Sequence, residues 1–151
     1  MGLDMYFIKS KEDKEEMAYF RKCYGINNWI KSKCKKIEDN YLFDTSILPP
    51  ILEKMKIYLD KMISVVEQDG YFIVSQTYKY EDLRLLVCEM DEDQNETYIK
   101  LDKIIKSFNI DGLTYNNFED GIWSTVGTFI QAYQQFTKLE GQGEIIYIES
   151  F

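Results

Sequence analysis

The feature that most constrains this fold is a long apolar stripe that begins just after a pair of prolines. Between residues 48 and 66, Leu, Ile, Met and Val recur every three or four positions, which is typical of one face of a helix of about five turns. Pro49 and Pro50 fit only the first turn of a helix, because proline lacks the N–H that later turns need. The pattern predicts a core helix that starts near Thr45 and Ser46.

Two short helices are expected before this core helix. Apolar residues in 17–24 recur at helical spacing, and Gly25 is a suitable end because glycine enters the left-handed conformation without steric cost. A second apolar stripe covers residues 26–37. Residues 9–16 and 39–44 are interpreted as a charged loop and a connector.

Two further helices are predicted in the second half of the chain. The first covers residues 98–108, where Asn95 can cap it, and the second covers 122–139, with Trp123 on its apolar stripe. Between them, 109–121 reads as a long loop, which in a domain of this size is either functional or poorly ordered. In this loop Tyr115, Phe118, Glu119 and Asp120 are weak functional candidates.

Strands are expected at 3–8, at 71–78 and at the tail 144–151. Residues 80–89 fit either a helix or a strand, since periodicity does not separate the two. The prediction is an α+β fold, with four to five helices packed on a small sheet of three to four short strands. A chain of 151 residues suits a single compact domain, 1–151, that buries roughly two-thirds of its unfolded surface.

Composition argues against several classes of site. The chain has no His, the commonest general base near neutral pH and the commonest metal ligand, so no metal site is expected. Its three cysteines are odd in number and form no CxxC pair, which favours a reduced, cytoplasmic setting. No apolar run approaches the ~18 residues of a membrane span, so no membrane association is expected.

The net charge of -8 comes from the second half of the chain. Residues 1–75 hold 12 basic and 12 acidic residues, whereas 76–151 hold 6 basic and 14 acidic. General nucleic-acid binding requires clustered cations, so this charge argues against it. The acidic half is expected to be a solvated surface or a surface for a basic partner.

No catalytic or cofactor motif is found. Asp91, Asp93 and Asn95 alternate like calcium ligands, but the Gly and Glu that complete an EF-hand loop are missing. Cys23 follows two cations that would lower a thiol pKa, yet no His completes a nucleophile–base pair. No cofactor is predicted, and an enzyme is the least favoured class.

The chemically densest stretch is residues 19–30, YFRKCYGINNWI, with four aromatics, two adjacent cations and an amide pair. It is either a structural corner with packed aromatics and solvated cations, or a patch for an anionic or planar partner. Asp4 and Tyr6, on the first predicted strand, are added as candidates because they could lie at the mouth of a pocket formed by this stretch. The predicted ligand- or partner-binding residues are Asp4, Tyr6, Tyr19, Arg21, Lys22, Asn27 and Trp29.

Four motifs carry a resemblance to a known family. They are GLDMY at 2–6, the block at 19–30, Asp39-Asn40 before a Leu-rich helix, and an aromatic-x-x-Ser-aromatic tail at 147–151. Together they resemble a family of small uncharacterised phage and prophage proteins that open MGLDMY and carry a YWRK-x-x-x-I-H-x-W-F block. The resemblance covers about the first 65 residues and the last five of the chain.

The chain departs from this family where the family has His, because Asn27 stands there, and where an aromatic follows Trp, because Ile30 stands there. A proton-transfer or metal role could not be kept at Asn27, but a recognition role could, since Asn still donates and accepts hydrogen bonds.

The resemblance implies a mobile-element origin and the cytoplasm of a bacterial host. By analogy with small phage accessory proteins, it implies a non-enzymatic protein that binds a partner macromolecule, such as a protein of host defence. The alternative is a small-ligand or nucleotide-binding module with a pocket around residues 19–30. The oligomeric state is left open.

Overall fold

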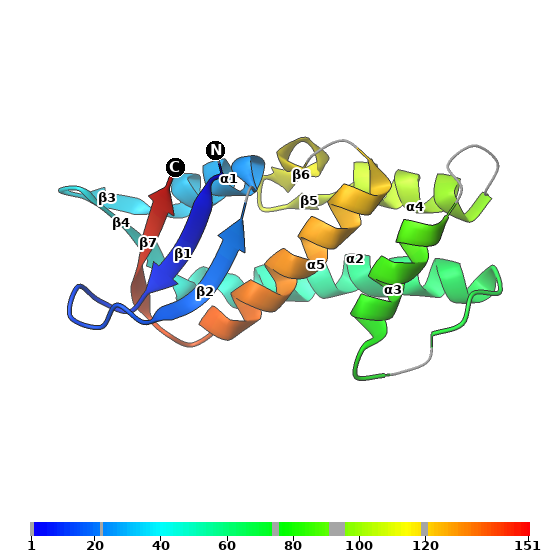
Figure 1. Cartoon of the computed structure of the whole chain (residues 1–151), viewed down its shortest axis with the longest axis horizontal. Coiled ribbons are helices and arrows are strands. Elements are labelled where there is room, and N and C mark those ends of the chain that lie inside the picture. The colour runs from blue at the N-terminus through cyan, green and yellow to red at the C-terminus, as the bar shows by residue number, and fades with distance from the viewer. Residues whose placement is uncertain (1, 22, 74–75, 91–95, 119–120) are drawn as a thin grey trace.

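In the computed structural model, a five-stranded sheet forms one end of an elongated molecule and helices form the other end (Figure 1). The structure describes residues 2–21, 23–73, 76–90, 96–118 and 121–151. The strands of this sheet are β1 (Asp4–Ile8), β2 (Glu16–Arg21), β3 (Lys35–Ile37), β4 (Asn40–Asp44) and β7 (Glu144–Ser150). The helices are α1 (Tyr24–Lys33), α2 (Leu48–Gln68), α3 (Lys79–Glu89), α4 (Glu96–Lys106) and α5 (Ile122–Leu139). The α+β class is confirmed.

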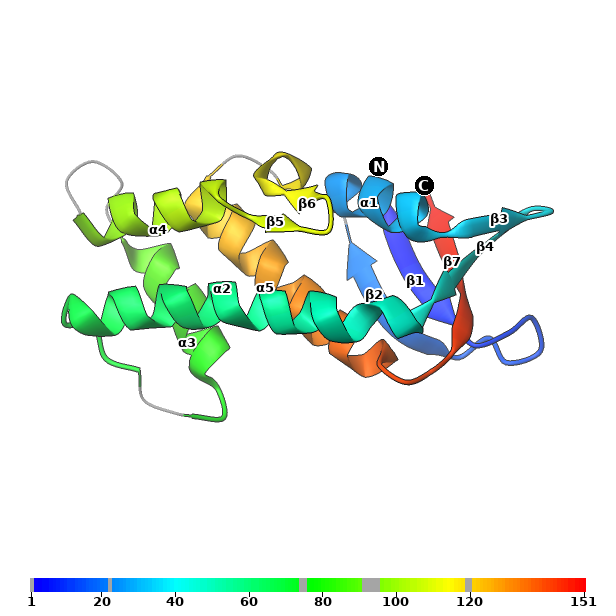
Figure 2. The ribbon, with the colours of Figure 1, turned by 180° about the vertical axis from the view of Figure 1, so that it is seen from behind.

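The core helix was predicted correctly and is α2. Its prolines lie in the first turn, and its buried residues follow the predicted stripe from Leu48 to Val66. A short 3-10 helix, η1 (Thr45–Ile47), leads into it. Figure 2 shows α2 running from the sheet to the far end of the molecule, so one helix contributes to the packing of both ends.

The sheet is antiparallel throughout, in the order β2-β1-β7-β4-β3. The C-terminal strand β7 lies between β1 and β4, which confirms the expectation that the tail joins a sheet. Met5 lies opposite Phe20 and Glu149, and Phe7 lies opposite Ala18 and Tyr147, so these side chains share one face.

Helices cover one face and one edge of the sheet. Helices α1 and α2 lie on the same side of it (Figures 1 and 2). Helix α5 follows the edge strand β2, where the Tyr19 N–H donates to Gln135 Oε1 at 2.9 Å. This contact satisfies a donor that an open edge would expose.

At the start of the chain, the first predicted helix is wrong, and the second occurs with different bounds. Residues 16–21 form strand β2 rather than a helix, because Ala18 and Phe20 alternate inward against β1. Gly25 does not end a helix, since it lies in the first turn of α1. Helix α1 itself ends at Lys33, before the predicted limit at Ile37.

The segment 35–44 is a β-hairpin rather than a helix end followed by a connector. Strand β3 pairs with β4, and β4 pairs with β7. These two strands are short and mostly exposed or half-buried, so their apolar pattern is weak. Together with β2, they bring the sheet to five strands, whereas three or four were predicted.

The second half of the chain was predicted better. Helices α4 and α5 occur where expected, and 80–89 proves to be helical as α3. The predicted strand at 71–78 is wrong, because 71–73 are irregular and 76–78 form a bend, while 74–75 lie outside the described residues. The proposed cap Asn95, with Asp91 and Asp93, also lies outside them.

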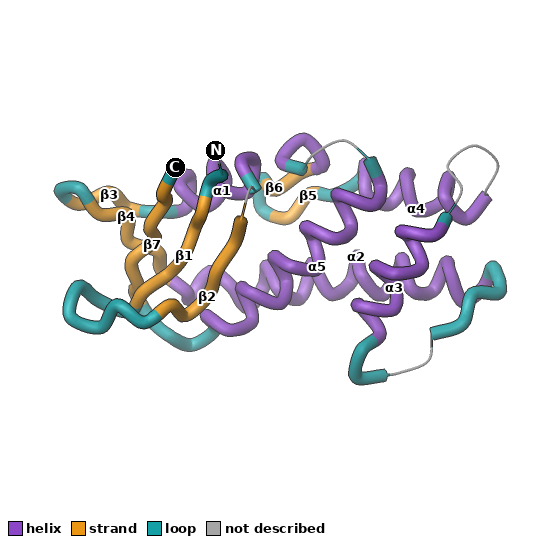
Figure 3. Tube along the Cα trace, in the orientation of Figure 1, coloured by secondary structure: helices purple, strands orange, loops and turns teal. Residues whose placement is uncertain are grey.

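The predicted loop at 109–121 contains secondary structure of its own. It forms a small hairpin and a 3-10 turn, seen in Figure 3 as orange and purple segments above α5. These elements are β5 (Asn109–Ile110), β6 (Leu113–Thr114) and η2 (Tyr115–Asn117).

Among the described helices, none combines the length and the apolar character needed to cross a bilayer.

Candidate functional site

Four of the predicted site residues lie together on β1 and β2, on the sheet face away from α1 and α2. Tyr19 donates its hydroxyl to Asp4 Oδ1 at 2.6 Å, and Arg21 Nε lies 3.8 Å from the same oxygen. Tyr6 lies opposite Tyr19 in the register. The hydrogen bond to the Asp4 carboxylate raises the pKa of Tyr19, because that bond requires the phenol proton.

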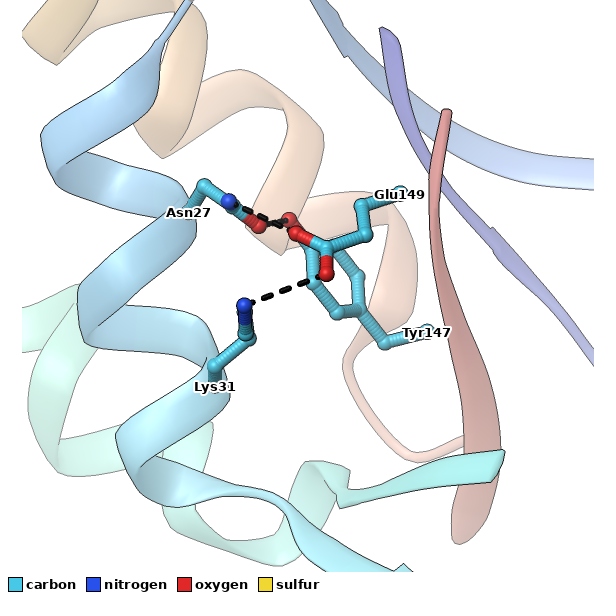
Figure 4. Close-up of polar contacts among 4 residues, drawn as sticks. All are labelled: Asn27, Lys31, Tyr147 and Glu149. Carbon is cyan, nitrogen blue, oxygen red and sulfur yellow. Dashed lines mark hydrogen bonds and ion pairs between the residues drawn. The ribbon is translucent and has the colours of Figure 1, made fainter. Parts of the chain in front are cut away.

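Asn27 faces the other side of the sheet, in a buried hydrogen-bond network (Figure 4). The Tyr147 hydroxyl donates to Asn27 Oδ1 at 2.6 Å, and Asn27 Nδ2 donates to Glu149 Oε2 at 2.8 Å. Lys31 Nζ completes the network at 3.1 Å from Glu149 Oε1. We call these four residues the α1–β7 network.

The network orients α1 on the sheet. Burial raises the pKa of Tyr147 far above its ordinary value, so its hydroxyl is a neutral donor at neutral pH. The hydrogen bond to Glu149 raises the pKa of Lys31, which keeps that ion pair charged. Every buried polar group of the network has a partner, so its arrangement is that of a structural clamp.

Trp29 is also buried, and its indole Nε1 donates to the Asp111 carbonyl at 3.1 Å. It therefore joins α1 to the β5–β6 hairpin. The six described candidates consequently do not converge on one cavity, because the sheet separates the β1–β2 group from Asn27 and Trp29. Lys22 lies outside the described residues.

A cleft of about 560 Å³ instead lies at the junction between the sheet and the helical end. We call it the junction cleft. The end of β2 and the start of α1 form one wall, α3 and α5 form another, and η2 contributes to its margin. Arg21 is the one predicted site residue among the described residues that line the cleft. Phe118, one of the candidates in the predicted loop 109–121, also lines it.

Two large aromatic side chains line the junction cleft while remaining open to solvent. Trp123 is 56% exposed and Tyr24 is 48% exposed. The spacing placed Trp123 on the buried stripe of its helix, and this was wrong, because Ile122, Val126 and Phe129 form that stripe. The apolar stripe of α5 is complete without Trp123, and this was the sequence signal that could have identified Trp123 as an exposed candidate for binding.

The charged side chains of the cleft are two cations and one anion among the described lining residues. Arg84 Nε lies 3.1 Å from Glu81 Oε2, and Gln134 Nε2 donates to Glu81 Oε1 at 3.3 Å. Arg21 is the second cation. The described lining residues therefore sum to a charge of +1, in a chain whose net charge is -8. The loop candidates Glu119 and Asp120, which follow Phe118 in the chain, lie outside the described residues.

The wall of the cleft depends on a close approach between α1 and η2. A Cβ added to Gly25 would overlap the Asn117 carbonyl and lie 2.7 Å from the Asn117 Cα. The Asn117 side chain reinforces this approach, because its Nδ2 donates to the Gly25 carbonyl at 3.0 Å. Glycine is needed here for space rather than for a left-handed turn.

No group of three or more His, Cys, Asp or Glu side chains that could hold a metal occurs within the described ranges. The chain matches no protein-family model, no curated protein and no solved structure.

Proposed function

We propose that the protein is a non-enzymatic, phage-type accessory protein that binds a partner protein through the junction cleft, with a component of host defence as one such partner. One observation carries the proposal: Trp123 and Tyr24 stay about half exposed beside Arg84 and Arg21 in a single cleft. Trp, Tyr and Arg are the residue types that most often dominate binding energy at protein interfaces.

The remaining cleft residues suit a polypeptide partner. Amide side chains, including Gln131 and Gln134, line the wall formed by α5. Each amide can both donate and accept, so such side chains can bind the backbone of a bound segment. A half-exposed ring gains the rest of its hydrophobic stabilisation only when a partner covers it, because that stabilisation scales with the apolar area removed from water.

The test is affinity capture from phage-infected host cells on immobilised protein at about 0.15 M salt, where nonspecific charge attraction is largely screened. We expect one specific host or phage protein to be retained, and Trp123→Ala to weaken its binding by about thirtyfold or more. Phe72→Ala is the matched control, because Phe72 is 78% exposed but does not line the cleft. Equal loss in both variants, or retention that disappears on a modest increase in salt, would refute the proposal.

A small-ligand or nucleotide-binding module is the second candidate. The cleft volume, about 560 Å³, falls in the range of ~300–1,000 Å³ found for small-molecule sites. A nucleotide that raises the melting temperature of the wild type, but not of Trp123→Ala, would favour this function over a protein partner.

A further inference from the structure

We infer that the junction cleft binds an oxyanion, a carboxylate or a phosphate, which replaces Glu81 at the Arg84 guanidinium. This inference rests on the proposed binding function of the cleft and adds the chemistry of the bound group. The Glu81 carboxylate, 3.1 Å from Arg84 Nε, occupies the position that such a group would take.

Glu81 is a weak internal occupant. Its side chain is 39% exposed and that of Arg84 is 41% exposed, and ion pairs this open to solvent contribute little to stability. Gln134 Nε2 already donates to the other oxygen of Glu81, so Glu81 keeps a partner when it leaves Arg84. The exchange therefore costs little, and it frees a guanidinium whose planar geometry matches a carboxylate or a phosphate.

Two further features favour an anion at this position. Arg21 lines the same cleft, and its nearest described carboxylate, Asp4, is 3.8 Å away, a longer separation than that of a direct hydrogen bond. The first turns of α1 and α5 also line the cleft, through Tyr24 and Trp123. The N-terminal end of a helix carries partial positive charge, which adds to the charge of the two arginines.

The oxyanion has an aromatic neighbourhood. Tyr24 and Trp123 line the cleft together with Arg84, so a bound group that joins an oxyanion to a ring or an apolar side chain uses both features. Phenyl phosphate and phenylacetate are the simplest probes of this kind, and benzyl alcohol is their uncharged counterpart.

The experiment is a titration of the folded, full-length protein with each probe, monitored by the NMR signal of the Trp123 indole N–H. We expect a saturable shift with at least one of the two anions and a weaker response to benzyl alcohol. Tighter binding of phenyl phosphate than of phenylacetate identifies a phosphate-bearing ligand as the source of the bound oxyanion. Equal or tighter binding of phenylacetate identifies the carboxylate of an acidic segment.

Three variants test the role of Glu81. Glu81→Gln removes the internal competitor and should tighten anion binding by about two- to fivefold, the range expected for a half-exposed ion pair. Glu89→Gln makes the same charge change on α3 at an exposed position outside the cleft and should leave the affinity unchanged. Arg84→Gln should weaken binding by about tenfold or more.

The inference is overturned if no anion gives a saturable shift, if Glu81→Gln and Glu89→Gln bind equally, or if Arg84→Gln binds the anions as the wild type does. Circular dichroism of each variant verifies that the fold is retained. In the capture experiment, loss of the partner with Trp123→Ala but not with Arg84→Gln would leave the proposed function standing and refute the oxyanion site alone.

Discussion

The replacement Asn27→Ala tests whether the α1–β7 network holds helix α1 on the sheet. Tyr147 is 1% exposed, and its hydroxyl donates to Asn27 Oδ1 at 2.6 Å. After truncation this hydroxyl has lost its acceptor in a site that excludes water, which costs about 1–3 kcal/mol. Loss of the Asn27–Glu149 hydrogen bond adds about 1 kcal/mol, since Glu149 keeps its ion pair with Lys31.

We therefore expect Asn27→Ala to lower the free energy of unfolding by about 2–4 kcal/mol, a large part of the ~5–15 kcal/mol typical of a domain. The measurement is urea denaturation followed by tryptophan fluorescence. Asn28→Ala is the matched control, because Asn28 is the next residue on the same helix and is exposed. Its effect should stay within about 0.5 kcal/mol.

A double-mutant cycle with Tyr147→Phe separates the hydrogen bond from general effects of truncation. The two replacements share one interaction, so their combined cost should be smaller than the sum of the single costs by about 1 kcal/mol or more. Additive costs, or equal stability of Asn27→Ala and Asn28→Ala, would show that the network does not hold α1 in place.

Three further predictions concern other parts of the chain. Gly25→Ala should destabilise the protein by about 1–3 kcal/mol or more, because the added Cβ would overlap η2. Gly127→Ala should stabilise α5 by about 0.5–1 kcal/mol, because the nearest atom to its added Cβ would lie 3.8 Å away. Equal shifts in the urea midpoint of the two variants would contradict this prediction. The hydrogen bond from Lys100 lowers the pKa of Asp69 below its ordinary value near 3.9. Its contribution to stability is therefore complete above about pH 4 and lost as the pH falls further, and Asp69→Asn should flatten that acid limb in pH-dependent denaturation. Burial raises the pKa of the Cys34 thiol to about 12. Iodoacetamide at pH 8 should therefore modify Cys34 slowly in the native protein and rapidly in urea, and mass spectrometry measures both rates. Rapid labelling of the native protein would contradict the burial of this thiol.

Helices were easier to predict than strands in this chain because their signals are local. The stripe of α2 and its two prolines lie within one segment, and every hydrogen bond of the helix closes within that segment. The terminal strand β7 was also predicted, since its apolar residues leave few alternatives to a sheet.

Strands β2, β3 and β4 were missed because their partners are distant or weakly patterned. Apolar spacing in 16–21 fits a helix as well as a strand, and pairing with β1 decides between them. Strand β4 owes its place to β7, about a hundred residues later in the chain. Local propensity carries no information about such a partner.

The junction cleft combines residues that the sequence identified with residues that it did not. Residues 19–30 were identified from their chemistry, and Arg21 and Tyr24 do line the cleft. Their partners in it, Arg84 and Trp123, come from α3 and α5, which no spacing in the sequence connects to that segment.

The sequence by itself determined the α+β class, the core helix and the chemical types available near residues 19–30, because these depend on composition and on short-range periodicity. The tertiary structure alone decided that Asn27 and Trp29 are buried while Trp123 is exposed, and that the junction cleft lies between β2 and α5. The physical reason is that burial and cavities are properties of packing between distant segments, and the free energy of that packing is shared among residues that no local pattern relates.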